Sequence, residues 1–496
     1  MSVPRQPPES PVPDRRRRLL VLCICSMSLL IVGLDATIVN VALPAIHRSL
    51  HAGVSGLQWT IDAYTLVLAT LLMLSGSTAD RIGRRRVFQI GLSLFALGSL
   101  LCALSPDLGL LIAARVLQAI GGSMLNPVAM SIIRNVFTDP RERAQAIGVW
   151  GGVVGISLAL GPVVGGLLIN AFSWRAVFLV NVPIGLLAIA LTARFVPESR
   201  AERPRRIDPI GQLLVIVALA ALIYAIIEAP SAGWLSAQTL SLGAVCAIAL
   251  TALIRYEHRV GQPLIEMRFF RSAPFSGATA LALGAFTVQG GFLFLNTLYL
   301  QETRGYSPLQ AGLDTLPMAI PLLVMAPLTG RFVGRHGNRV PLLAGSAAVA
   351  AGGLMLTALS PTTPLLYLFG SYLLVGFGMG LLNPPITNTA VSGMPPSMAG
   401  VAAAIASTAR QGGSTLGVAV FGALAGGSGV AGVSPAFAAS THPAWWVVVG
   451  IGVTLFGVGV LTTTPWARRT AERAAEVIEE ETSAPPPGAD ASLVAH

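Results

Sequence analysis

GSTADRIGRRR, residues 76–86, is a short basic segment between two long uncharged stretches, which extend from Ala63 to Ala79 and from Val87 to Pro106. A segment of this kind predicts a tight loop between two membrane-spanning helices, on the side of the bilayer where positive charge is retained. Gly76 and Gly83 permit close approach and unusual φ angles, while Asp80 can pair with an arginine or cap a helix. The arginines that anchor this face are Arg81, Arg84, Arg85 and Arg86. The alternative is an ordinary positively charged loop of a polytopic membrane protein.

The overall composition excludes a soluble globular protein. Of the 496 residues, 53% are hydrophobic and only 11% are charged, compared with roughly 25% charged residues in a typical soluble domain. The 53 glycines and 34 prolines suit membrane helices that pack closely and bend. The apolar stretch near the N-terminus is too long for a signal-peptide core, so we expect it to be retained as the first span.

Fourteen stretches are apolar and long enough to cross about 30 Å of hydrocarbon, which needs roughly 20 residues each. Helices are the expected element, because in lipid each backbone polar group must be satisfied within its own segment. The predicted spans are 19–46, 57–77, 87–106, 108–133, 144–170, 174–196, 208–229, 236–256, 274–300, 308–330, 340–359, 363–391, 400–425 and 442–464.

The distribution of basic residues predicts the orientation. All 32 are arginine, and most fall in the N-tail, in the even-numbered loops between spans and in the C-tail. The opposite loops contain only Arg48, Arg175 and Arg304. Since basic residues are retained in the cytoplasm, we expect both termini there, in the cell membrane. The net charge of +10 is thereby explained without a nucleic-acid partner.

Short motifs recur at nearly constant spacing, which indicates two related halves. Gly76, Arg81, Gly83 and Arg85 match Gly330, Arg335, Gly337 and Arg339, with Gly334 at the position of Asp80; Leu125-Asn126-Pro127 matches Leu382-Asn383-Pro384. We therefore expect an all-α membrane protein with two pseudo-symmetric six-helix bundles and an inserted helix pair. The expected organisation is a cytoplasmic N-tail (1–18), a first bundle (19–196), a linker with two extra helices (197–273), a second bundle (274–464) and a largely disordered cytoplasmic C-tail that begins as a surface helix (465–496).

Two charged residues fall inside the predicted spans at similar depth. Asp35 lies about 25 Å of helix rise past Leu19, and Arg115 lies early in the fourth span. Isolated charges in hydrocarbon are costly, so such residues pair, neutralise or face the bundle interior. Burial favours a neutral carboxyl group and a nearby arginine favours the carboxylate, so Asp35 is a candidate for proton exchange. A static ion pair between two helices is the alternative.

The remaining charges near the spans allow several interpretations. Asp62, near the outer end of the second span, is either a second proton-exchanging group or an interfacial residue. Arg410, in the middle of the thirteenth span, is expected to bind backbone carbonyls or an acid on the other half. Glu228 and Asp314 lie at outer helix ends, where we expect them to be solvated.

The fifth predicted span contains a glycine-proline pattern that favours bending. Pro162 removes a helix hydrogen bond, and the glycines beside it leave a flat face for another helix. The predicted hinge consists of Gly161, Pro162, Gly165 and Gly166.

Cysteine and histidine usage gives no sign of a metal site or of catalysis. Cys23, Cys25, Cys102 and Cys246 lie in apolar runs and are expected to be buried free thiols. With neither a phosphate-binding loop nor a nucleophile arrangement, we expect no enzyme activity, no metal and no cofactor.

Five segments resemble motifs of the major facilitator superfamily. GSTADRIGRRR resembles its helix 2–3 loop, and LDATIVNVALPAI (34–46) resembles the first-helix motif of the fourteen-helix drug/proton antiporter branch. RVLQAIGGS (115–123) is similar to the fourth-helix motif, and RQGGSTLG (410–417) resembles the thirteenth helix. The glycine-proline pattern matches the antiporter motif of exporters, with Ser157 where a further glycine is usual. The resemblance covers most of residues 19–464.

This resemblance implies proton-coupled efflux of hydrophobic or cationic toxic small molecules or antibiotics by alternating access. It implies that Asp35 and Arg115 couple transport to protons, that Asp80 with its arginines is the cytoplasmic gate, and that Gly161-Pro162 is the hinge. A mostly apolar cavity between the halves would hold the substrate. Candidate lining residues are Asn40, Trp59, Asp62, Tyr64, Gln289, Phe292, Asn296, Asn383 and Arg410.

Two alternatives to multidrug efflux are a dedicated exporter and a proton symporter for uptake. The protein is either a broad multidrug exporter or a dedicated exporter of one self-made antibiotic or metabolite, and the sequence hardly separates the two. Uptake by proton symport is disfavoured by the glycine-proline motif. The expected partners are a small-molecule substrate, protons and the lipid bilayer, with the protein acting as a monomer driven by the proton gradient.

Overall fold

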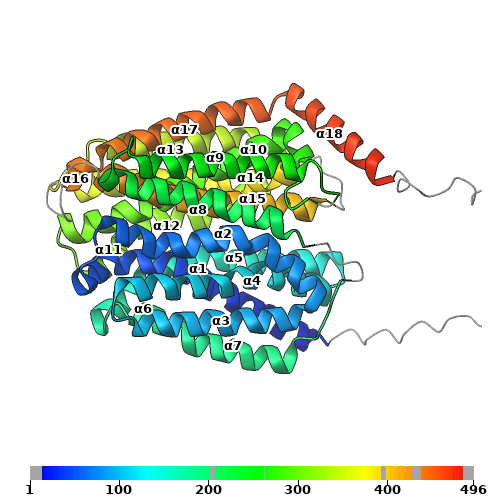
Figure 1. Ribbon diagram of the computed structural model, residues 1–496, viewed down its shortest axis with the longest axis horizontal. Coiled ribbons are helices and arrows are strands. Elements are labelled where there is room, and N and C mark those ends of the chain that lie inside the picture. Colours follow the sequence, from blue (N-terminus) through cyan, green and yellow to red (C-terminus); the bar gives the residue numbers. More distant parts are fainter. Residues whose placement is uncertain (1–13, 202–206, 262, 393–397, 427–436, 484–496) are drawn as a thin grey trace, which may run out of the picture. The chain divides into compact units, whose positions relative to one another are not determined.

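The computed structural model describes residues 14–201, 207–261, 263–392, 398–426 and 437–483, and all regular structure in these ranges is helical (Figure 1). The N-terminal residues and the end of the C-tail lie outside the described residues, so the disorder expected for the tail is not addressed. By contact, the chain divides into two compact units, which are described separately.

The first unit comprises residues 1–52, 59–207 and 307–313. Its helices are α1 (Arg15–Leu50), most of α2 (Val54–Ile82), α3 (Arg84–Leu104), α4 (Leu108–Val136), α5 (Pro140–Ala171), α6 (Ala176–Leu179), α7 (Asn181–Phe195) and nearly all of α11 (Pro308–Asp314). Within it, α1 packs against α5, and α3 packs against α4 and α7.

The second unit comprises residues 53–58, 208–306 and 314–496. Its helices are the start of α2, α8 (Pro209–Ala232), α9 (Ala237–Glu257), η1 (Met267–Arg271), α10 (Ala273–Leu298), η2 (Tyr299–Thr303), α12 (Leu316–His336), α13 (Arg339–Leu356), α14 (Leu365–Val391), α15 (Ala399–Gly426), α16 (Phe437–Ser440), α17 (His442–Thr462) and α18 (Pro465–Ser483). The helices expected as an inserted pair, α8 and α9, belong to this unit. A helix, α18, is present at the start of the C-tail; its location on the membrane surface stays a prediction.

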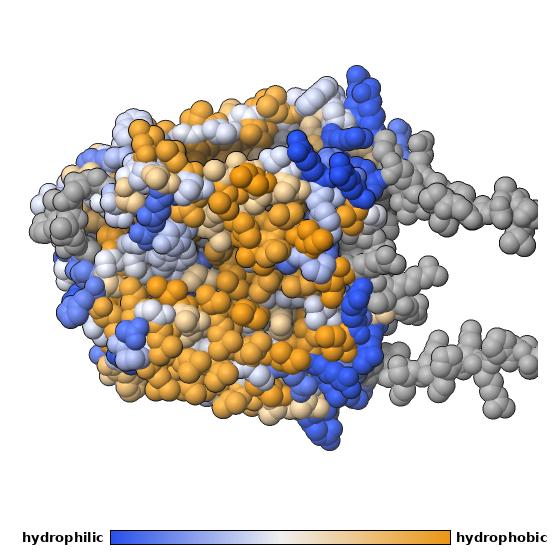
Figure 2. All heavy atoms as spheres, in the orientation of Figure 1, coloured by the Kyte–Doolittle hydropathy of each residue, from blue (hydrophilic) through white to orange (hydrophobic). Residues whose placement is uncertain are grey.

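Thirteen helical stretches in the described residues are long and apolar enough to cross a membrane, and each coincides with a predicted span. The predicted span 400–425 coincides instead with α15, which is not among the thirteen because polar residues such as Arg410 and Gln411 lower its hydropathy. Hydrophobic residues cover most of the visible helix surface, and hydrophilic residues gather near helix ends (Figure 2). The chain is a multi-pass membrane protein; the count of fourteen spans stays a prediction.

Short polar side chains and glycines set the helix ends. Asp107 accepts a hydrogen bond from the backbone N–H of Leu110 at the start of α4, at 2.9 Å, and Asp139 caps α5 in the same way. Gly83 between α2 and α3 has φ 124°, and Gly337 between α12 and α13 has φ 82°. Only glycine adopts such angles without strain. The two loops that match in sequence therefore also share a glycine with a positive φ angle.

The expectation of four buried thiols is wrong for one cysteine. Cys25, Cys102 and Cys246 are buried, but Cys23 is exposed on α1. Cys23 and Cys25 are two positions apart, so at 3.6 residues per turn they point to opposite sides of the helix. The apolar sequence of α1 does not distinguish these sides.

Candidate functional site

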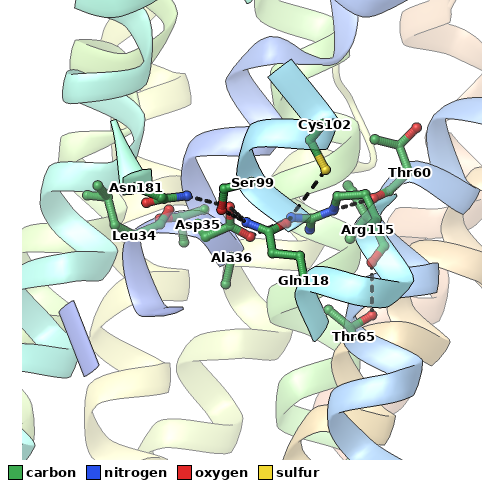
Figure 3. A network of polar contacts seen from close by, with 12 residues as sticks. Leu34, Asp35, Ala36, Thr60, Thr65, Ser99, Cys102, Arg115, Gln118 and Asn181 are labelled. Atoms are coloured by element: carbon green, nitrogen blue, oxygen red, sulfur yellow. Dashed lines mark hydrogen bonds and ion pairs between the residues drawn. The ribbon is translucent and has the colours of Figure 1, made fainter. Parts of the chain in front are cut away.

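Asp35 and Arg115 meet in a buried polar network within the first unit (Figure 3). Arg115 Nη1 lies 2.5 Å from Asp35 Oδ2, and the two side chains are 1% and 0% exposed. The other carboxylate oxygen, Asp35 Oδ1, accepts from Gln118 Nε2 at 2.8 Å and from Asn181 Nδ2 at 3.1 Å. The two charges therefore pair, which is one of the outcomes that their similar depth in the sequence allowed.

Arg115 is held on several sides. Its Nε donates to the carbonyl of Thr60 at 3.0 Å, and its Nη1 donates to Gln118 Oε1 at 2.7 Å. The guanidinium carbon lies 4.1 Å from the ring centre of Tyr64 and 5.7 Å from that of Phe178, distances at which cation–π attraction operates. The network thus joins α1, α2, α4, α6 and α7.

Close helix packing positions Gln118 in this network. A Cβ added to Gly98 on α3 would lie 2.5 Å from the backbone nitrogen of Gln118, and one added to Gly121 on α4 would lie 2.4 Å from that of Phe95. Because neither position has room for a side chain, α3 and α4 approach closely. Gln118 Nε2 then reaches Ser99 Oγ at 2.8 Å.

The network stabilises a charged Asp35. An arginine and two amide donors satisfy both oxygens, and hydrogen bonds to charged groups are among the stronger ones. Separating Asp35 from Arg115 would leave a buried carboxylate without a cation, which is costly.

Asp62 has a different environment. It is 0% exposed; Thr65 Oγ1 donates to its Oδ1 at 3.5 Å, and its Oδ2 has no hydrogen-bond partner among the described residues. The structure buries this side chain within the protein and leaves both interpretations of Asp62, a second proton-exchanging group or an interfacial residue, as predictions.

The residues of the predicted gate lie together at the α2–α3 junction. Asp80 Oδ1 accepts from Arg84 Nε at 3.2 Å and from Nη2 at 3.0 Å. Arg81 is exposed and Arg85 is half-buried. A Cβ added to Gly76 would lie 3.9 Å from that of Pro127, an ordinary contact, so packing does not require a glycine there.

Glu198, which sequence reasoning missed, holds this junction. Its Oε1 accepts from the backbone N–H of Arg85 at 3.1 Å, and its Oε2 lies 3.8 Å from Arg86 Nε. A Cβ at Gly83 would lie 2.7 Å from Glu198 Oε1. A hydrogen bond from the Arg84 backbone N–H to the Ser199 carbonyl, at 2.9 Å, fixes the same segment. The negative charge of Glu198 made it a candidate partner for the arginine cluster. Glu198 lies 113 positions after Arg85 in the sequence, so the contact could not be predicted.

The predicted hinge residues are packing positions. A Cβ at Gly161 would lie 1.9 Å from Thr37 Oγ1, and one at Gly165 would lie 2.7 Å from Ile38 Cγ1, so both serve the α1–α5 contact. A Cβ added to Gly166 would lie 2.5 Å from the Cα of Leu309 on α11. On the same helix, Gly312 faces the carbonyl of Pro162.

Ser157 keeps the α1–α5 contact close although it stands where a further glycine is usual. A Cβ added to Gly33 on α1 would lie 2.2 Å from Ser157 Oγ. The glycine at this contact is therefore Gly33 on α1, opposite Ser157 on α5.

The remaining candidates in the first unit lie in different settings. Tyr64 is fully buried beneath Arg115 and is part of its network. Asn40 is 5% exposed; its Nδ2 donates to the Ala36 carbonyl at 3.1 Å, and its Oδ1 has no hydrogen-bond partner among the described residues. Trp59 is half-buried.

The candidates in the second unit fall into two groups. Phe292 and Asn296 are buried on α10 beside Tyr372, whose hydroxyl donates to Asn296 Oδ1. Gln289 on α10 is 8% exposed and Asn383 on α14 is half-buried.

Arg410 lies on α15 and is half-buried. It donates to Thr387 Oγ1 at 3.1 Å and to Ser407 Oγ at 2.7 Å. Its partners here are hydroxyl groups, where carbonyls or an acid were expected. In the described part of the chain, no group of three or more His, Cys, Asp or Glu side chains is placed to hold a metal ion.

Comparisons with known proteins agree with this architecture. The sequence profile of the Major Facilitator Superfamily matches residues 25–418. "Multidrug resistance protein Stp" of Mycobacterium tuberculosis (strain CDC 1551 / Oshkosh) is 40% identical over 409 residues, which cover 82% of this chain and 76% of that protein. "Tetracenomycin C resistance and export protein" of Streptomyces glaucescens is 36% identical over 83% of this chain and 76% of its own length.

A solved structure supports the fold. The crystal structure of a bacterial homolog to the human lysosomal transporter Spinster, inward-facing and unoccupied, superposes with a TM-score of 0.65 at 17% identity, covering 93% of this chain and 99% of that one. At this identity the likeness concerns the fold alone. With the profile match and the relatives above, this chain belongs to the major facilitator superfamily.

Proposed function

We propose that this protein exports toxic small molecules, hydrophobic or cationic, across the cell membrane by drug/proton antiport. The observation that carries the proposal is the buried Asp35–Arg115 pair at 2.5 Å in a chain whose relatives are named for multidrug resistance and antibiotic export. A transporter needs no covalent chemistry, so we propose no enzyme activity and no cofactor, with the proton gradient as the energy source.

The proposed architecture has fourteen spans in two six-helix bundles with α8 and α9 inserted between them. The positive φ angles of Gly83 and Gly337, at corresponding positions of the two loops, support the relation between the halves. The position of α15 at a predicted span supports the count. The proposed boundaries remain 1–18, 19–196, 197–273, 274–464 and 465–496, with both termini cytoplasmic because arginines concentrate on that side and with the monomer as the working unit.

The proton pathway in this proposal uses two acids in turn. Asp35 keeps its charge while it is bound to Arg115, and Asp62, buried without a cation, holds a proton. When the conformation changes and the pair separates, Asp35 takes up a proton and Arg115 is left with Gln118 and Thr60. One elementary charge moved across 100 mV supplies about 2.3 kcal/mol, so one or two protons per cycle suffice for moderate substrate gradients.

The gate and hinge have structural parts in this cycle. Gly76, Asp80, Arg81, Gly83, Arg84 and Arg85 form the proposed cytoplasmic gate, which Glu198 holds against the end of α7. The proposed hinge is the stretch of α5 around Pro162, with Gly161, Gly165 and Gly166 sliding on α1 and α11. The proposed substrate contacts are Asn40, Trp59, Tyr64, Gln289, Phe292, Asn296, Asn383 and Arg410.

The breadth of the substrate range is tested in an efflux-deficient host that expresses the protein. Protection against several unrelated dyes and antibiotics supports a multidrug exporter, and protection against a single compound supports a dedicated exporter. Inverted membrane vesicles test the direction: an antiporter accumulates substrate while imposed protons leave. Accumulation that requires protons to enter with the substrate would support symport and contradict the proposal.

A further inference from the structure

The first turn of α2 is fixed by buried hydrogen bonds inside the second unit. Gln58 is 1% exposed, and its Nε2 donates to the carbonyls of Val418 at 3.1 Å and Ala419 at 2.8 Å on α15. A Cβ at Gly422 would lie 2.5 Å from Gln58 Cδ, so only glycine leaves room for the amide. Residues 53–58 accordingly belong to the second unit, while the rest of α2, from Trp59, belongs to the first.

Helix α8 supplies a second attachment for this turn. Ser55 Oγ donates to Glu228 Oε1 at 2.8 Å, and Ser231 Oγ lies 3.4 Å from Glu228 Oε2. Glu228 is half-buried, so the expectation that it is simply solvated does not describe it. A carboxylate that accepts from hydroxyls on two helices is a stronger and more directional contact than apolar packing.

We propose that Glu228, with Ser55 and Gln58, forms a releasable anchor that holds the start of α2, and that carrying this anchor is a role of the inserted helix α8. This inference rests on the proposed export by alternating access. Since α2 continues into the first unit at Trp59, movement of one unit against the other must either release these hydrogen bonds or bend α2 there. A contact through half-buried serine and glutamate side chains is suited to release, because water can replace each partner.

The anchor is tested by cross-linking. In a protein whose four native cysteines are replaced by alanine, Ser55→Cys and Glu228→Cys are combined and joined with a short bis-methanethiosulfonate reagent. A spacer is used because cysteine is shorter than the glutamate that it replaces, which widens the gap between the two reacting atoms. The matched control combines Glu228→Cys with Ser231→Cys, which places both cysteines on α8.

The anchor predicts a high cross-linking yield at rest and a loss of export of at least ten-fold, which reductant reverses. The control on α8 should cross-link equally well and export at the unlinked rate. Normal export by the Ser55–Glu228 cross-linked protein would overturn the proposal, and so would a low yield in the resting protein. If the cysteine-free protein that retains Ser55 and Glu228 exports nothing, the export function itself falls, whereas the cross-linking yield still tests the contact.

Discussion

Asp35→Asn removes one negative charge from the buried network while keeping the size and shape of the side chain. Arg115 then has no counter-ion at 2.5 Å and is 1% exposed. Removing one partner of a buried ion pair costs about 3–5 kcal/mol, because the other charge stays uncompensated. Arg115 keeps Gln118 Oε1 at 2.7 Å and the Thr60 carbonyl at 3.0 Å, so we expect the lower end, about 3 kcal/mol.

The double variant Asp35→Asn/Arg115→Gln separates the effect of the ion pair on stability from its effect on proton-coupled transport. With both charges removed, the free energy of unfolding should recover by about 2 kcal/mol relative to the sum of the single changes, since the two residues touch. Proton-driven export should be lost in Asp35→Asn and should stay lost in the double variant. Stability is measured by thermal unfolding in detergent and export by dye efflux from vesicles under an imposed pH difference.

Two results would refute this reasoning. Strictly additive stability effects would show that the pair does not interact energetically. Proton-driven efflux by a folded Asp35→Asn protein would leave Asp35 as part of a static ion pair, the alternative that its sequence context left open.

Three further substitutions test other parts of the structure. Gly161→Ala should lower the thermal stability and the export rate, because the new methyl overlaps Thr37 Oγ1 at 1.9 Å; Thr37→Ala should partly restore both, and Gly151→Ala, with nothing within 4 Å, is the neutral control. Glu198→Gln should cost about 1 kcal/mol and increase proteolysis at the end of α7; unchanged proteolysis would exclude a holding role. Asp62→Asn should change stability by less than about 1 kcal/mol, since it replaces a neutral acid, yet flatten the pH dependence of efflux; a strong loss of stability would indicate that the acid is charged.

The sequence predicted the spans and the similar depth of the two central charges because both follow from local energetics. Apolar runs of sufficient length must be helical in lipid. Two opposite charges at similar depth have few alternatives to meeting each other, and Asp35 and Arg115 do meet. Thirteen of the expected spans coincide with described helices that are long and apolar enough to cross a membrane, for the same reason.

The partners of that pair were not predictable in the same way. Gln118 lies one turn after Arg115 and so shares its face, but Asn181 and Ser99 are uncharged polar residues on other helices. Uncharged polar residues are tolerated at many positions in a span, and only the packing of α3 on α4 and of α7 on α1 identifies those that take part. Arg410 illustrates the same limit, because hydroxyl groups of nearby residues satisfy it without an acid.

In the proposed antiport cycle, substrate leaves as protons enter. Purified protein in liposomes containing a pH-sensitive dye tests it directly, when a transported cation is added on one side without any imposed gradient. Antiport predicts substrate-dependent proton movement in the opposite direction, which Asp35→Asn abolishes. Proton movement in the same direction as the substrate, or substrate transport with no proton movement, would contradict it.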